Sequence, residues 1–270
     1  MSLEIINGDC LEIMKTLEDK SIDVILTSPP YNISTGLKSN KEQKCSDYQR
    51  MYDVYIDSMT SDEYCKWVSN LFISFDRILK DNGVVIWNTS YSSNSQKMDS
   101  VESTWLSIAE ILKTTDFSIA DKITWKKNNA IPNNSSNKLS RMCEDVFVFA
   151  RRKDFKTFKS NKKIICEKNG SKFYENIHNL ICAKNNDSDV ESRKLNTATF
   201  STEFAEKLLA IYALPNSIVL DPFSGTGTTL NACKNLNLNG IGIELSESQC
   251  EYARKRINFF SNVDLKIDEW

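Results

Sequence analysis

Short apolar runs that alternate with amphipathic helical segments constrain the fold of this chain more than any other feature. Residues 21–27 form such a run, which ends in Ser28-Pro29-Pro30, where proline prevents continuation as a helix. Further strands are expected at 83–88, 119–125, 145–150, 217–220 and 240–243, and helices at 61–79, 105–113, 202–213, 229–235 and 246–259. The alternation predicts an α/β fold, a parallel or mixed sheet with helices on both faces.

The 270 residues are enough for one large domain or for a domain with an inserted lobe. Between Arg151 and about Thr197 the apolar periodicity fades, and Lys, Asn and Ser dominate. We therefore expect one domain in three parts: a first half at 1–150, an inserted basic region at 151–197 and a second half at 198–270.

Cysteine usage and apolar content exclude several classes of protein. The eight cysteines are spread without a C-x-x-C pair, and His178 is the only histidine, so no metal site and no disulfide framework are expected. Residues 1–6 lack the basic segment followed by an apolar stretch that is typical of a signal peptide, and no apolar run approaches the roughly 20 residues that span a bilayer. We expect a reduced, cytoplasmic protein that does not enter a membrane.

A glycine-rich string, Asp221-Pro-Phe-Ser-Gly-Thr-Gly-Thr-Thr229, joins a predicted strand to a predicted helix. Gly225 and Gly227 would let the backbone approach a ligand closely. Glu244 ends the next strand about 20 residues later, where an acid bonds ribose hydroxyls in nucleoside-binding folds. A lone Gly-x-Gly pair usually marks a tight turn, whereas the whole string is more specific and lacks the ending of an ATP- or GTP-binding P-loop. Together these features predict a nucleoside pocket.

The pentapeptide Thr27-Ser-Pro-Pro-Tyr31 follows the first predicted apolar strand, at the end where open α/β sheets bind ligands. Taken alone, it also fits a rigid surface turn. Together with the glycine-rich string it resembles the amino-methyltransferases of bacterial restriction-modification systems. In that family Asp/Asn/Ser-Pro-Pro-Tyr/Phe is the catalytic loop, and Phe-x-Gly-x-Gly holds S-adenosylmethionine. The catalytic motif comes first here, which resembles the β group, and the likeness lacks a motif match only at 32–59 and 151–196.

This resemblance implies a permuted Rossmann-like methyltransferase sheet with helices on both faces and an irregular inserted target-recognition region. It implies transfer of a methyl group from S-adenosyl-L-methionine to the exocyclic amine of a base that is flipped out of double-stranded DNA. Family members with Ser at the first motif position are more often cytosine N4 enzymes, so cytosine N4 is favoured and adenine N6 is the alternative. A homodimer and a cognate restriction endonuclease are possible partners.

The resemblance also assigns roles to residues. Ser28, Pro29, Pro30 and Tyr31 are the catalytic candidates. An exocyclic amine is a weak nucleophile that must be held by acceptors, which Ser28 Oγ and the Pro29 carbonyl can supply, and Tyr31 offers a ring on which the base can stack. The cofactor candidates are Asp9, Thr199, Phe200, Asp221, Phe223, Gly225, Gly227, Thr228, Thr229 and Glu244. The family's usual His-Pro wording before the glycine motif is replaced by Asn196-Thr-Ala-Thr-Phe-Ser201, which leaves the contacts of Thr199 and Phe200 open.

Other candidates have an ordinary structural alternative. Asn32 and Trp125 are candidates for the target-base pocket, but Trp125 equally fits a core aromatic. Asp9 also fits a helix N-cap. The segment 151–172 contains nine basic residues and two acids. This composition predicts contacts with DNA phosphates, and the alternative is a solvated loop. The phosphate candidates are Arg151, Arg152, Lys153, Lys162 and Lys163. The segment 34–59 is a candidate for ordering on DNA.

Two other function classes remain open from the sequence. Methyltransferases of RNA or of protein amides carry similar Asn-Pro-Pro-Tyr loops, but they usually place the glycine motif first. A non-catalytic nucleic-acid-binding module would not need intact Ser28, Glu244 and glycines. The chain contains no Pro-Cys dipeptide, which disfavours methylation of cytosine carbon 5 through a cysteine nucleophile.

Overall fold

The computed structural model describes residues 1–32, 59–89, 99–130, 139–158, 160–196 and 199–258, with positions 132, 134 and 136. Apart from Met59, the segment expected to order on DNA lies outside the described residues. Within the described ranges, no helix combines the length and the apolar character that a membrane crossing would need.

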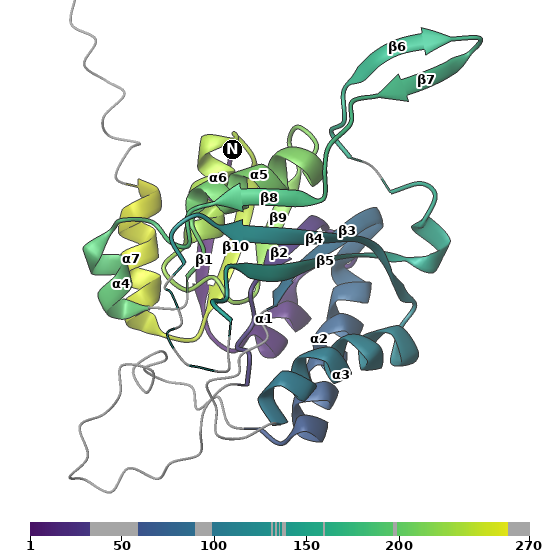
Figure 1. Cartoon of the computed structure of the whole chain (residues 1–270). Helices are drawn as coiled ribbons and strands as arrows, with labels where there is room; N and C mark the ends of the chain where they lie inside the picture. The colour runs from purple at the N-terminus through teal and green to yellow at the C-terminus, as the bar shows by residue number, and fades with distance from the viewer. Residues whose placement is uncertain are drawn as a thin grey trace, which may run out of the picture.

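An eight-stranded mixed sheet of order β1-β10-β9-β2-β3-β5-β4-β8 forms the body of the molecule (Figure 1). Its strands are β1 (Leu3–Asn7), β2 (Ile22–Thr27), β3 (Leu79–Thr89), β4 (Phe117–Lys127), β5 (Cys143–Arg151), β8 (Leu180–Ala183), β9 (Ile218–Asp221) and β10 (Asn239–Glu244). Only β5 runs antiparallel to its neighbours, and the other strand pairs of this sheet are parallel. The carboxyl ends of β1, β10, β9, β2 and β3 therefore meet at one edge, where such sheets bind ligands.

Helices cover both faces of the sheet. The helices are α1 (Cys10–Thr16), α2 (Ser61–Ile78), α3 (Asp99–Thr114), α4 (Val190–Leu195), α5 (Thr202–Tyr212), α6 (Thr228–Asn235) and α7 (Glu247–Asn258). Ile25 of β2 packs in one core cluster with residues of α1, α2 and α3, whereas its neighbours Val24 and Leu26 pack in another with residues of α5 and α6. Successive strand residues point to opposite faces, so an almost continuous apolar run is buried on both sides.

The two parts of the chain that flank the basic region form one sheet, because β2 of the first pairs in parallel with β9 of the second. Most predicted elements are present with shifted ends. The helix expected at 105–113 begins at Asp99, and the strand expected at 83–88 begins at Leu79. The short strand β1 was not predicted, and α1 was anticipated only by the interpretation of Asp9 as a helix N-cap.

One part of the region at 151–197 projects from the main sheet, and another part belongs to the core. Strands β6 (Ile164–Lys168) and β7 (Ser171–Tyr174) form an exposed hairpin that projects from the body of the molecule (Figure 1). The chain then returns as β8, which pairs with β4 and buries Ile181 and Ala183. The expectation of irregular loops outside the core is therefore wrong for β8, since its backbone completes the edge of the main sheet.

Candidate cofactor and catalytic site

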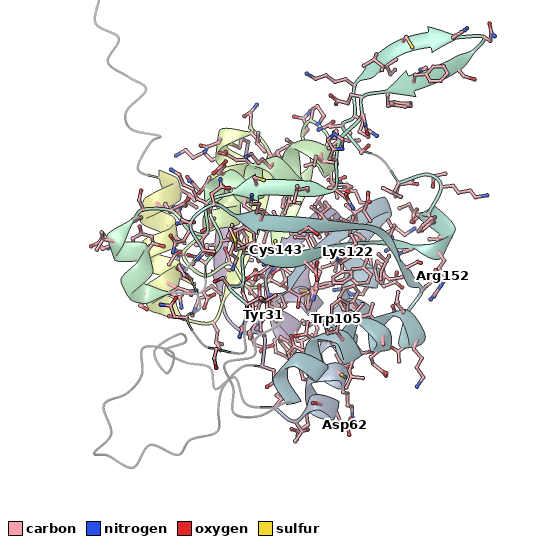
Figure 2. All side chains as sticks on the ribbon, viewed as in Figure 1. Tyr31, Asp62, Trp105, Lys122, Cys143 and Arg152 are labelled. Carbon is pink, nitrogen blue, oxygen red and sulfur yellow. The ribbon has the colours of Figure 1, made fainter. Side chains whose placement is uncertain are left out.

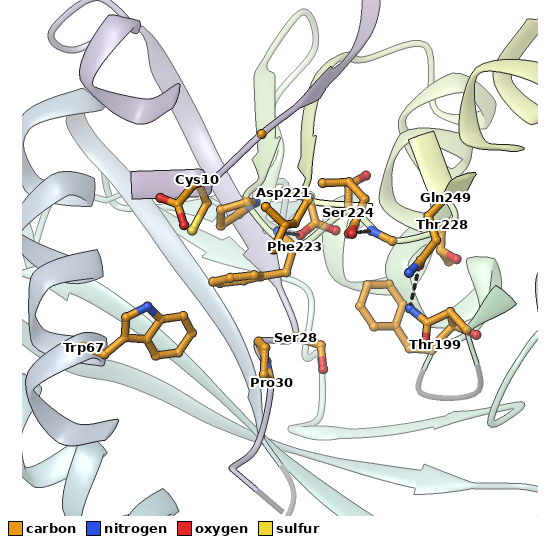
Figure 3. A pocket seen from close by; sticks show the side chains of 18 residues that line it. Cys10, Ser28, Pro30, Trp67, Thr199, Asp221, Phe223, Ser224, Thr228 and Gln249 are labelled. Carbon is orange, nitrogen blue, oxygen red and sulfur yellow. Dashed lines mark hydrogen bonds between the residues drawn. The ribbon is translucent and has the colours of Figure 1, made fainter. Parts of the chain in front are cut away.

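A pocket opens at the edge of the sheet where the loops after β1, β2, β9 and β10 meet (Figure 3). Ten of the predicted cofactor and catalytic residues line it: Asp9, Ser28, Pro30, Thr199, Phe200, Asp221, Phe223, Gly225, Thr228 and Glu244. The catalytic loop and the glycine-rich turn thus share one cavity, although about 190 residues separate them in the chain.

Glu244 supports the glycine-rich turn with both carboxylate oxygens. Its Oε2 accepts the backbone N–H of Gly225 at 2.8 Å, and its Oε1 accepts that of Ser246 at 2.9 Å. A carboxylate offers about four lone-pair sites, enough to hold the turn and to accept ribose hydroxyls as well. Glu244 lies at the carboxyl end of β10, where the sequence predicted a ribose contact.

Asp221 connects the catalytic strand to the cofactor turn. Its Oδ1 accepts the hydroxyl of Thr27 at 2.7 Å and the N–H of Phe223 at 3.1 Å, and its Oδ2 accepts the hydroxyl of Thr229 at 2.5 Å. Burial raises the pKa of Asp221 from 3.8 to about 6, against the lowering effect of these hydrogen bonds. The end of β2, which carries the catalytic loop, is thereby tied to the end of β9.

Gly227 and Thr229 do not line the pocket. Gly227 is the N-cap of α6 with φ of 79°, and a Cβ at this position would lie 2.9 Å from Cβ of Ala253. Thr229 is buried behind the turn, where it donates to Asp221. Both residues shape the glycine-rich turn from behind, so their predicted role in binding the cofactor is indirect.

Asp9 is the N-cap of α1, because its Oδ1 accepts the N–H of Glu12 at 3.1 Å. The alternative interpretation of this residue is therefore correct. Asp9 also lines the pocket, so a contact with the cofactor stays a prediction.

The catalytic loop is held by polar contacts from several elements. Ser28 Oγ lies 2.6 Å from the hydroxyl of Tyr31, and the carbonyl of Pro30 accepts the hydroxyl of Tyr64 at 2.8 Å. Pro29 and Pro30 are buried, and Asn32 donates its side-chain amide to the carbonyl of Met59. Tyr31 is not among the residues that line the pocket, so its stacking on a base and the role of Asn32 stay predictions.

The prediction that Trp125 forms a wall of the target-base pocket is wrong. Its side chain is only 2% exposed and stacks on Phe204 with ring centroids 4.0 Å apart. Phe204 belongs to α5, which covers the sheet, so Trp125 is a core residue.

The prediction of a phosphate contact is also wrong for Arg151, which is 3% exposed. Its guanidinium pairs with Asp76 and donates to the backbone carbonyls of Asp76, Leu79 and Lys80. Because β5 is antiparallel to β3, Arg151 lies beside the beginning of β3, whereas the catalytic loop lies beside its end.

The other phosphate candidates also lie away from the pocket. Arg152, which lies well away from Tyr31 in Figure 2, donates to carbonyls of Leu112 and Thr115 at the end of α3. Lys153 pairs with Asp81. Asn161, next to Lys162 and Lys163, donates to carbonyls of Ile211 and Ala213, which precede β9. All four therefore lie at the sheet end opposite Ser28, away from the pocket, and their contact with DNA phosphates stays a prediction.

Eight residues that line the pocket were not predicted as site residues, namely Gly8, Cys10, Trp67, Asn196, Pro222, Ser224, Leu245 and Gln249. Trp67 lies within the helix expected at 61–79, and the centroid of its ring lies 5.5 Å from that of Phe223. Asn196 donates to Gln249 at 3.0 Å and joins two segments that no local pattern connects. The sequence offered two signals: Pro222 and Ser224 lie inside the glycine-rich string, and Trp67 is aromatic.

Comparison with known proteins identifies the family. A model of the N6/N4 DNA methylase family, described as DNA methylase, matches residues 22–255. The chain belongs to this family. It is 30% identical over 259 residues to the type II methyltransferase M.HinfI of Haemophilus influenzae, covering 94% of this chain and 67% of that protein. The type II methyltransferase M.BglII of Bacillus subtilis is 25% identical, covering 93% of this chain and 67% of the relative.

Solved structures agree with this assignment. The crystal structure of the M1.HpyAVI-SAM complex is 26% identical with a TM-score of 0.60, covering 95% of this chain and 99% of that one. The cytosine-N4-specific PvuII DNA methyltransferase shares the fold, with 16% identity and a TM-score of 0.68, covering 100% of this chain and 89% of that one. The predicted methyltransferase sheet, the enzyme class and the cofactor are confirmed: the protein is an S-adenosylmethionine-dependent DNA amino-methyltransferase.

Proposed function

We propose that this DNA methylase transfers the methyl group of S-adenosylmethionine to N4 of a cytosine that is flipped out of double-stranded DNA. The observation that carries the proposal is that Ser28 and Pro30 of the catalytic loop line the same cavity as Phe223 and Glu244 of the cofactor half. Serine at the first motif position favours cytosine N4, and adenine N6 remains the alternative.

The residues of the pocket fit the cofactor. Trp67 and Phe223 supply apolar ring surface for an adenine, and the carboxylate of Glu244 stands where ribose hydroxyls can donate to it. When bound, S-adenosylmethionine supplies an electrophilic methyl group on a sulfonium. Thr199 and Phe200 line the same pocket and are proposed to contact the remainder of the cofactor.

The protein's own part in the reaction is to aim the amine. Ser28 Oγ and the carbonyl of Pro29 accept hydrogens of the exocyclic amine and orient its lone pair toward the methyl donor. Transfer would be direct and in line: the new N–C bond would form as the S–C bond of the sulfonium breaks, S-adenosylhomocysteine would leave, and the amine would release one proton to solvent. No covalent intermediate with the enzyme is needed. The ring of Tyr31 stacks on the extruded base.

The identity of the methylated base tests the proposal. Purified protein is incubated with tritiated S-adenosylmethionine and DNA of mixed sequence, and the digested nucleosides are identified by mass. Labelled N4-methylcytosine supports the proposal, whereas labelled N6-methyladenine keeps the enzyme class and overturns the base. Absence of any labelled DNA nucleoside, with cofactor binding intact, would favour RNA or protein as the substrate.

Ser28→Ala is the matched variant for this assay. Loss of the acceptor is expected to slow methyl transfer on the order of 100-fold, while the affinity for S-adenosylmethionine stays within about twofold. A homodimer and a cognate restriction endonuclease remain predictions, to be tested by sedimentation and by co-purification.

A further inference from the structure

A buried polar chain stands behind the catalytic loop. Asn88, at the carboxyl end of β3, is 1% exposed, and its Nδ2 lies 2.8 Å from the hydroxyl of Tyr31 and 3.4 Å from Ser28 Oγ. The same nitrogen lies 3.0 Å from Oε2 of Glu144, which is 8% exposed. The other oxygen of Glu144 pairs with Lys127. None of these three residues was singled out from the sequence.

The sheet brings these residues together from three strands. β5 runs antiparallel to both β3 and β4, so its first residues lie beside the last residues of those strands. Glu144 therefore reaches Asn88 on one side and Lys127 on the other. All three lie at the sheet edge that carries the catalytic loop.

The side-chain amide of Asn88 is oriented so that its oxygen has no hydrogen-bond partner among the described residues. Its amino group faces three oxygen atoms, while its Oδ1 is buried without a partner in the described part of the chain. A flipped amide would turn Oδ1 toward the carboxylate of Glu144, and two acceptors would then face each other. The other carboxylate oxygen of Glu144 is held by the ion pair with Lys127. The carboxylate thus selects the orientation in which the amide donates to Tyr31 and Ser28, although an acceptor stays unpaired.

We propose that Glu144, charged and paired with Lys127, is a positioning residue that acts through Asn88 to hold Ser28 and Tyr31 in their reactive arrangement. The inference rests on the proposed function, because it assumes that Ser28 holds the target amine. Methyl transfer demands that this acceptor stay aligned with the amine, and a displacement of about 1 Å can cost on the order of 100-fold in rate. Glu144 itself need not touch either substrate.

The first variant is Glu144→Gln, which keeps the shape of the side chain and removes its charge. We expect the single-turnover rate of methylation to fall roughly 10- to 100-fold, while the dissociation constant of S-adenosylmethionine and the melting temperature change little. The control is Asp23→Asn, because Asp23 also pairs with a lysine, Lys80, and accepts a backbone N–H, that of Ile218, but lies away from the pocket. This control should keep the wild-type rate.

A double-mutant cycle distinguishes positioning from a general structural role. If Glu144 acts through Asn88, Glu144→Gln should cause little further loss in a chain that already carries Asn88→Ala. Should Asn88→Ala fail to fold, Tyr31→Phe takes its place, since it keeps the ring and removes the hydroxyl that Asn88 holds. The combined loss should then be smaller than the product of the two separate losses.

Either of two kinetic results would overturn the inference: a Glu144→Gln rate within about twofold of the wild type, or separate losses that multiply in the double variant. A parallel loss of cofactor affinity and melting temperature would also overturn it, because it would indicate general disruption. Wild-type methylation of DNA is measured first, so a failure of the proposed function is seen independently of the variants.

Discussion

Glu244→Gln is expected to weaken the binding of S-adenosylmethionine strongly. The two carboxylate oxygens hold the N–H groups of Gly225 and Ser246 at 2.8 and 2.9 Å, and we propose that they also accept the ribose hydroxyls. Loss of one hydrogen bond to a charged group costs about 1.5–3 kcal/mol. At about 1.4 kcal/mol per factor of ten, the dissociation constant should rise about 10- to 150-fold.

The same substitution should lower the stability of the free protein. Whichever way the glutamine amide turns, its NH2 group faces one of the two backbone N–H donors, and an unpaired buried donor costs about 1–3 kcal/mol. The melting temperature should therefore fall by several degrees, which differential scanning calorimetry can measure.

Isothermal titration calorimetry with S-adenosylmethionine provides the binding assay. Glu247→Gln is the matched control, because Glu247 lies three residues away on α7 and makes only an exposed ion pair with Arg254 among the pairs found in the described residues. Its dissociation constant should equal that of the wild type. A dissociation constant for Glu244→Gln within about twofold of the wild type would refute the ribose contact.

Three further predictions concern stability. Arg151→Ala should lower the free energy of unfolding in urea by about 3 kcal/mol, because it removes a buried guanidinium from an ion pair and several carbonyls. The pKa of Asp221 is about 6 in the folded protein, against an ordinary 3.8, so the folded state holds this proton more tightly. The free energy of unfolding should therefore fall as pH rises from 4 to 6, by at most ~3 kcal/mol, and Asp221→Asn should remove this dependence. Gly242→Ala should cost about 1–3 kcal/mol, because a Cβ would lie 2.5 Å from Ser224 Oγ.

Each of these has an outcome that contradicts it. The half-exposed Arg152 is the control for Arg151, and equal losses for the two alanine variants would argue against the buried pair. If the free energy of unfolding depends on pH in the same way for the wild type and for Asp221→Asn, Asp221 does not have a raised pKa in the folded protein. Ser224→Ala should recover part of the loss in Gly242→Ala, and the absence of any recovery would place the clash elsewhere.

The cofactor half could be predicted well from the sequence, because its pattern is local. The turn around Gly225 and the acid Glu244 belong to one unit of consecutive strand, helix and strand. The backbone of that unit brings them into one pocket. The position of Trp67 could not be predicted in this way. Its place beside Phe223 depends on how α2 packs across the sheet.

The amino-acid sequence by itself determined the alternation of strands and helices, the proline turn that follows β2 at Ser28 and the glycine-rich turn. Periodicity, proline and glycine act within a few residues, so their consequences can be worked out without a partner segment. The roles of Arg151 and Trp125, and the contact between Asn88 and Glu144, were decided only by the tertiary structure. They depend on the direction of β5 and on the packing of α5, and such contacts join residues that are tens of positions apart, which no local pattern records.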